Sequence, residues 1–173
     1  MMLATESNEK TEVLLVLIEN GADVNAAYNS GWTSLMLAAR YNENPEVLKI
    51  LIENGADVNA GFRVRDTALR YTALVWAAIG NSNPDVLRVL IENGADINAA
   101  NEDGWTPLME AARRNENPEV IRFLIDKGAN VNTATQSGWT PLMFAVRANV
   151  IFPIKLHTPQ TLISLSPPRS VRS

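Results

Sequence analysis

The chain has no cysteine and only one histidine, His157. Without cysteine it can form neither a disulfide framework nor a thiolate metal site, and one imidazole does not supply the ligands of a zinc site. No apolar run approaches the roughly 18–20 residues that a membrane span requires. Residues 1–6 contain no basic segment and precede no apolar run, so we expect no secretion signal. These absences are compatible with a reducing compartment, and we expect a cytoplasmic protein with no metal, cofactor or membrane contact.

Basic residues are scarce relative to acidic ones. Asp and Glu number 19 against 15 Lys and Arg, which gives a net charge of −4 and a pI near 5.0. Nucleic-acid binding favours a basic footprint, so we expect no nucleic-acid partner. Most carboxylates recur at regular intervals, which indicates a structural role, and we interpret His157 as an exposed linker residue. The pattern therefore predicts no catalytic site.

One segment occurs four times along the chain, the last time with substitutions, at residues 17–26, 51–60, 90–99 and 124–132. Its glycines lie 34, 39 and 34 residues apart, at Gly21, Gly55, Gly94 and Gly128. Two further markers keep the same register, Gly-Trp-Thr at residues 31–33, 104–106 and 138–140, and Asn-Pro at residues 44–45, 83–84 and 117–118. Self-similarity at this period predicts a repeat protein.

Each unit is predicted to contain a turn, a short helix, a loop and a second helix. Thr106 can accept the free amide protons at a helix start, and Pro107 fits the first helical position because no N–H is needed there. The pair at 117–118 starts the second helix in the same way, and Gly128 ends it in the left-handed conformation. We expect positive φ angles at the equivalent Gly55 and Gly94. Short helices with one apolar side are unstable alone, so the units must stack around a shared core.

The run Thr-Pro-Leu-x-x-Ala-Ala, followed by a second helix and Leu-Ile-x-x-Gly-Ala-Asp-Val-Asn-Ala, resembles the ankyrin repeat over roughly residues 1–148. Methionine or valine replaces the histidine that often follows Thr-Pro-Leu, and Asn-Glu-Asn-Pro replaces the usual Gly-His between the helices. The resemblance implies an all-α ankyrin solenoid whose turns project as β-hairpin fingers. It also implies that the first helices line a concave groove and that the array binds other proteins without catalysis.

The unit boundaries follow from the three markers. We expect a partial unit at 1–26, units at 27–60, 61–99 and 100–133, a partial unit at 134–148, and a non-repeat, largely disordered tail at 149–173. In the first unit, residues 1–4 align with a first helix and residues 11–20 with a second. The third unit carries five extra residues before Thr72. Apolar residues of the tail could fold back over the last helix; alternatively, the array is cut short there and the tail serves no purpose.

Aromatic residues hold one finger position in the last four units. They are Trp32, Tyr71, Trp105 and Trp139. They either pack between adjacent fingers or act as anchors for a partner, since aromatics are enriched in binding hot spots. A second position, on the first helices, varies in chemistry through Leu37, Trp76, Glu110 and Phe144. We take Trp76 and Phe144 from that set as partner-binding candidates.

Arginines lie at the ends of three of the first helices. They are Arg40, Arg113, Arg114 and Arg147, with Tyr41 beside the first. They are either solvated cations near a helix C-terminus or a basic groove suited to an acidic peptide. The extended third finger adds Phe62, Arg63, Arg65 and Arg70, which are either tolerated drift in a loop or a further contact.

The sequence thus predicts a protein–protein interaction module, a scaffold that binds a partner with an acidic segment through its finger tips and groove. We expect a monomer. One alternative is a structural unit that self-associates through its incompletely capped last repeat. Another is a degenerate fragment without activity.

Overall fold

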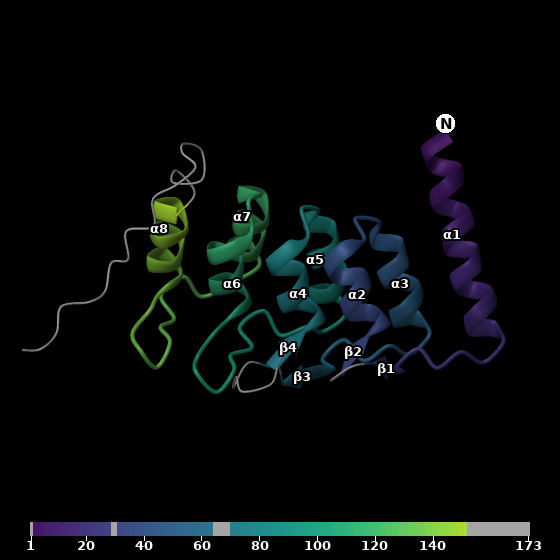
Figure 1. Ribbon diagram of the computed structural model, residues 1–173, viewed down its shortest axis with the longest axis horizontal. Helices are drawn as coiled ribbons and strands as arrows, with labels where there is room; N and C mark the ends of the chain where they lie inside the picture. The colour runs from purple at the N-terminus through teal and green to yellow at the C-terminus, as the bar shows by residue number, and fades with distance from the viewer. Residues whose placement is uncertain (1, 29–30, 64–69, 152–173) are drawn as a thin grey trace, which may run out of the picture.

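The computed structural model describes residues 2–28, 31–63 and 70–151, as a row of paired helices with turns along one edge (Figure 1). The helices are α1 (Met2–Glu19), α2 (Ser34–Tyr41), α3 (Pro45–Glu53), α4 (Ala73–Gly80), α5 (Pro84–Glu92), α6 (Pro107–Arg114), α7 (Pro118–Asp126) and α8 (Pro141–Ile151). Strands β1 (Ala27–Tyr28) and β2 (Trp32–Thr33) form one antiparallel hairpin, and β3 (Gly61–Arg63) and β4 (Arg70–Thr72) form another. The expected all-α solenoid is confirmed.

Helix starts follow the predicted chemistry. The Thr106 hydroxyl accepts a hydrogen bond from the Met109 N–H at 3.4 Å, ahead of Pro107. The Asn117 side chain accepts one from the Glu119 N–H at 3.0 Å. Equivalent caps open the other central helices, at Thr33, Asn44, Thr72 and Asn83. Each pair of caps therefore fixes where the two helices of a unit begin.

The units stack through two rows of helices. The first helices α2, α4, α6 and α8 pack in sequence, and α3, α5 and α7 form the row beside them (Figure 1). Leucines at equivalent positions are almost completely buried, at Leu35, Leu74 and Leu108 on the first helices and at Leu51, Leu90 and Leu124 on the second helices. Gly55, Gly94 and Gly128 end the second helices with φ of 90°, 89° and 99°, as predicted. The result is one hydrophobic core that runs through the second, third and fourth units, with residues of the first unit packed against it.

Asparagine side chains join neighbouring units, which the sequence analysis did not predict. The Asn81 side-chain amide donates to the carbonyls of Ala39 and Asn42, one unit back, at 2.9 and 3.0 Å. Asn115 repeats this contact toward Ala78 and Asn81. On the finger side, Asn25, Asn59 and Asn98 each donate to the carbonyl of the terminal glycine one unit ahead. The recurrence of asparagine in register was the available signal.

The two ends of the array differ from the regular units, and the N-terminal end also differs from the two separate helices expected there. The first unit contains one continuous helix, α1, because the positions equivalent to Asn44-Pro45 hold Lys10-Thr11 and nothing interrupts the helix there. In the fifth unit α8 continues to Ile151, which occupies the position of the capping asparagine. The predicted tail beyond this point, including His157, lies outside the described residues.

Candidate partner-binding face

Two aromatic stacks lie between the fingers and the first helices. In the first, the Trp76 ring on α4 packs against Trp32 at a centroid distance of 4.3 Å and against Tyr71 at 4.7 Å. Trp32 belongs to the finger of the preceding unit and Tyr71 to the finger of the same unit. These rings therefore pack between fingers and a first helix, and the Trp32–Trp76 contact crosses a unit junction. Such stacking contributes about 0.5–1.5 kcal/mol per pair beyond apolar burial.

The second stack repeats this arrangement two units further along. Phe144 on α8 lies 4.4 Å from the Trp105 ring and 5.2 Å from the Trp139 ring, measured between centroids. Phe144 occupies in its unit the position of Trp76, and the two tryptophans occupy those of Trp32 and Tyr71. Phe144 is buried, while both tryptophans remain half-exposed. The two stacks thus provide rigid, partly accessible ring surfaces.

Glu110 interrupts the series between the two stacks. It holds the position of Trp76 and Phe144 on α6, and it is 2% exposed. Its carboxylate lies 3.2 Å from the Arg113 Nη2 and 3.2 Å from the Arg114 Nε. The charge is therefore stabilised by two guanidinium groups, as burial of a carboxylate requires.

Burial and the nearby Glu110 charge raise the pKa of the Tyr71 hydroxyl, which lies 3.4 Å from the carboxylate.

Arginines lie over the aromatic rings. The Arg40 guanidinium carbon is 4.4 Å from the centre of the Trp76 ring, Arg113 is 4.9 Å from Trp105, and Arg147 is 5.4 Å from Trp139. These contacts are cation–π interactions. We call the surface formed by the two stacks and these arginines the aromatic–arginine face.

The charges on this face are only partly compensated. Arg113 and Arg114 share the single carboxylate of Glu110. Among the described residues, no salt bridge involves Arg40 or Arg147. The face therefore carries excess positive charge on a protein whose net charge is −4.

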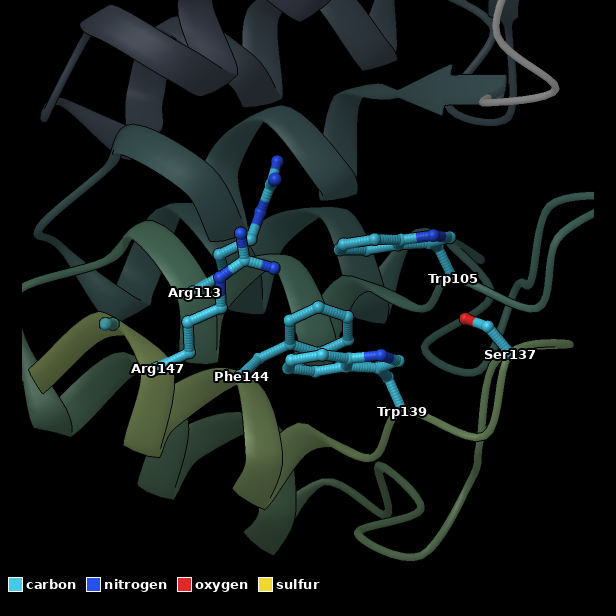
Figure 2. A pocket seen from close by; sticks show the side chains of 7 residues that line it. Trp105, Arg113, Ser137, Trp139, Phe144 and Arg147 are labelled. Atoms are coloured by element: carbon cyan, nitrogen blue, oxygen red, sulfur yellow. The ribbon is translucent and has the colours of Figure 1, made fainter. Parts of the chain in front are cut away.

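A hollow of about 430 Å³ opens at the C-terminal end of the face, and we call it the terminal slot (Figure 2). Its lining residues are Trp105, Arg113, Ser137, Trp139, Phe144, Arg147 and Ala148. Figure 2 shows the Trp105 and Trp139 rings facing each other, with the Ser137 hydroxyl directed toward the space between them and the two arginines at the other end. The slot thus combines flat apolar walls with cationic groups.

The remaining predicted partner-binding residues differ in exposure and in their distance from the aromatic–arginine face. Tyr41 is 68% exposed, with the Arg40 guanidinium 5.1 Å from its ring. Tyr71 and Trp76 are buried, so they support the face from within the stack. Phe62, Arg63 and Arg70 lie on the β3–β4 hairpin, whose ladder is one residue pair longer than that of β1–β2. Arg65 lies outside the described residues.

The described residues show neither a metal site nor a membrane span. They contain no cluster of three metal-ligating side chains. Within the same ranges, no helix is both long and apolar enough to cross a membrane.

A comparison with known families decides the class of the protein. A family model described as ankyrin repeats, in three copies, matches residues 1–101 and 74–152. The chain belongs to the ankyrin repeat family. Ankyrin repeats generally serve as protein–protein interaction modules and are typically not catalytic. A search of curated proteins found no match.

Proposed function

We propose that this ankyrin repeat protein acts in the cytoplasm as a scaffold, binding an acidic segment of a partner protein through its aromatic–arginine face. The observation that carries the proposal is the placement of Arg40, Arg113 and Arg147 on one face of an acidic protein, with no ion-pair partner for Arg40 or Arg147 among the described residues. Complementary charge across an interface supplies orientation and speeds association. The absence of cysteine is compatible with the compartment.

The aromatic stacks support the same function. Binding energy at interfaces concentrates at aromatic and arginine side chains set in well-packed surroundings. Trp105 and Trp139 present partly exposed rings that Phe144 holds in place, so they lose little freedom when a partner docks. The face is therefore preorganised, which lowers the entropic cost of binding.

Charge reversal tests the proposal. Wild-type protein and the double variant Arg40→Glu/Arg147→Glu would be immobilised and exposed to native lysate, and retained proteins identified by mass spectrometry. A matched control, Lys49→Glu/Arg122→Glu, makes the same charge change at exposed ion pairs on the second helices α3 and α7. We expect wild type and control to retain the same partners and the double variant to lose them. Retention of the same proteins by all three would contradict the proposal.

Self-association is a second candidate, favoured by one observation. Leu142 and Met143 on α8 are 72% and 50% exposed, whereas Leu108 and Met109, at the same positions of the preceding unit, are 2% and 0% exposed. Another copy stacked on α8 would cover this apolar surface. Sedimentation at micromolar concentration tests it: a dimer that Leu142→Glu dissociates would support this candidate, and a wild-type monomer would contradict it.

A further inference from the structure

We propose that the terminal slot recognises a short linear motif, a Glu or Asp followed two residues later by an aromatic residue, in an extended segment of the partner. This inference rests on the proposed function and specifies the ligand of one part of the same face. The other parts of the face, around Arg40 and Trp76, are not needed for it.

The cationic end of the slot selects a carboxylate. Arg147 makes no salt bridge among the described residues and is exposed, so its guanidinium can accept a new anionic partner. Arg113 lies at the same end but already pairs with Glu110. A guanidinium binds a carboxylate through two parallel N–H donors, which gives both strength and orientation. Two arginines also disfavour a cationic ligand, although three aromatic rings line the slot.

The apolar walls select a flat side chain. Trp105 and Trp139 face each other in the slot and are half-exposed, and the Phe144 ring lies between them at the arginine end, packed against both. An aromatic ring entering this space would stack on indole, and ring pairs prefer offset-stacked or edge-to-face geometries at 4.5–7 Å. The Ser137 hydroxyl, 3.0 Å from that of Thr135, adds a polar group where a ring substituent such as a phenol hydroxyl would emerge.

The geometry of the slot sets the spacing of the motif. The Arg147 guanidinium carbon lies 5.4 Å from the Trp139 ring centre. In an extended chain, side chains two residues apart point to the same side and lie roughly 6–7 Å apart. A carboxylate at one position and a ring two residues later can therefore reach the guanidinium and the indole together. Residues three apart point to opposite sides and cannot do so.

The other units that carry a finger differ from the last one at the positions that form the slot. In the third unit Ile79 holds the position of Arg113 and Arg147. Tyr71 is also buried, at 6% exposure. In the fourth unit, Glu110 neutralises the arginines. In the second unit Arg40 also makes no salt bridge among the described residues and the Trp32 ring is half-exposed, but the Arg40 guanidinium lies over Trp76 of the next unit. In the last unit the uncompensated Arg147 lies over Trp139, the half-exposed finger ring of its own unit.

Peptide binding tests the inference directly. Four synthetic peptides in a Gly/Ser background would carry Glu-x-Tyr, Gln-x-Tyr, Glu-x-x-Tyr or phosphoserine-x-Tyr, and each would be titrated into the ¹⁵N-labelled full chain. We expect Glu-x-Tyr to shift the indole N–H signals of Trp105 and Trp139 and to bind at least about tenfold more tightly than the Gln or three-residue-spaced peptides. Equal affinity of the first three peptides, no binding, or binding of the phosphopeptide alone would overturn the motif.

Variants then locate the site. Arg147→Gln should weaken binding of the Glu-x-Tyr peptide about tenfold and leave the Gln-x-Tyr peptide unaffected, whereas the control Arg122→Gln should change neither. Unaltered affinity in Arg147→Gln would overturn the assignment of the slot. A different result would contradict the proposed function, namely retention of the lysate partners by the Arg40→Glu/Arg147→Glu variant. Partners that depend on Arg40 but not on Arg147 would refute the slot and leave the broader function standing.

Discussion

The phenolic oxygen of Tyr71 lies 3.4 Å from the Oε1 of Glu110, across the junction between the third and fourth units. This contact marks the point where the two aromatic stacks are separated by a buried carboxylate. Glu110 in turn holds Arg113 and Arg114, so one side chain connects the packing of the array with the charge of its binding face. Several properties of the protein should therefore depend on this junction.

The raised pKa of Tyr71 predicts a loss of stability at high pH. The ordinary pKa is 10.0, and burial and Glu110 raise it in the folded state. Above pH 10 the unfolded chain loses this proton while the folded chain keeps it, so the free energy of unfolding falls as pH rises through the folded pKa. Urea melts at pH 9 and pH 11 should show a larger decrease for wild type than for Tyr71→Phe. Equal decreases would show that the hydroxyl is not coupled to folding.

Replacing Glu110 should separate its packing role from its charge. Glu110→Ala removes the carboxylate and leaves a void, and we expect a loss of about 1–3 kcal/mol. Glu110→Phe places a ring between Tyr71 and Trp105, as Phe144 lies between its neighbours, and should retain more stability than the alanine variant. It also frees Arg113 and Arg114, so affinity for an acidic partner and its salt dependence should both increase. Chemical denaturation and titrations at two salt concentrations check these outcomes; a phenylalanine variant less stable than the alanine variant would reject the stack.

The asparagine contacts between units predict that alanine substitution lowers the free energy of unfolding more at Asn81 than at Asn42. Asn81 is 2% exposed and makes two hydrogen bonds to the preceding unit and one to the Asn83 N–H. Asn81→Ala leaves two buried carbonyls without this donor, so we expect a loss of about 2–4 kcal/mol. In the equivalent Asn42, the side chain accepts from the Asn44 N–H within its own unit. Asn42→Ala should cost less, and a thermal melt in which both variants lose the same stability would argue against an inter-unit role.

Alanine substitutions at Gly94 and Gly104 should distinguish the cost of a left-handed backbone from the cost of steric contact. Gly94 has φ of 89°, and a Cβ there would meet no atom within 4 Å, so Gly94→Ala should cost about 1 kcal/mol through backbone strain alone. Gly104 has φ of 83°, and a Cβ there would lie 3.1 Å from the Ala134 carbonyl oxygen. Gly104→Ala should therefore cost more than Gly94→Ala in urea denaturation. The reverse order would show that the last two fingers are not closely packed.

The repeat period and the helix starts could be read from the sequence because they depend on local chemistry. The threonine and asparagine caps, the prolines after them and the glycines with positive φ all act within a few residues. The same reasoning explains why α1 is continuous, since Lys10-Thr11 lacks the signal that the other units carry. The arginines at the ends of first helices were also identifiable from register alone.

The burial of Glu110 could not be predicted in this way. A glutamate in an acidic protein is usually a surface residue, and only the stacking of the third and fourth units brings Tyr71 against Glu110, which two arginines of its own helix already pair with. The pairing of rings across unit junctions is equally a result of tertiary packing. The asparagines lay in register, but their partners are backbone carbonyls about thirty residues or more away.

The most direct test of the binding face is the dissociation constant of one partner recovered from lysate, measured by titration calorimetry against wild type, Arg40→Glu/Arg147→Glu and the control Lys49→Glu/Arg122→Glu. All three should give the same helical circular dichroism spectrum. Reversal at the face should weaken binding at least about tenfold, while the control should stay close to wild type. Equal weakening in both variants, or none in either, would contradict the assignment of the aromatic–arginine face as the site of partner binding.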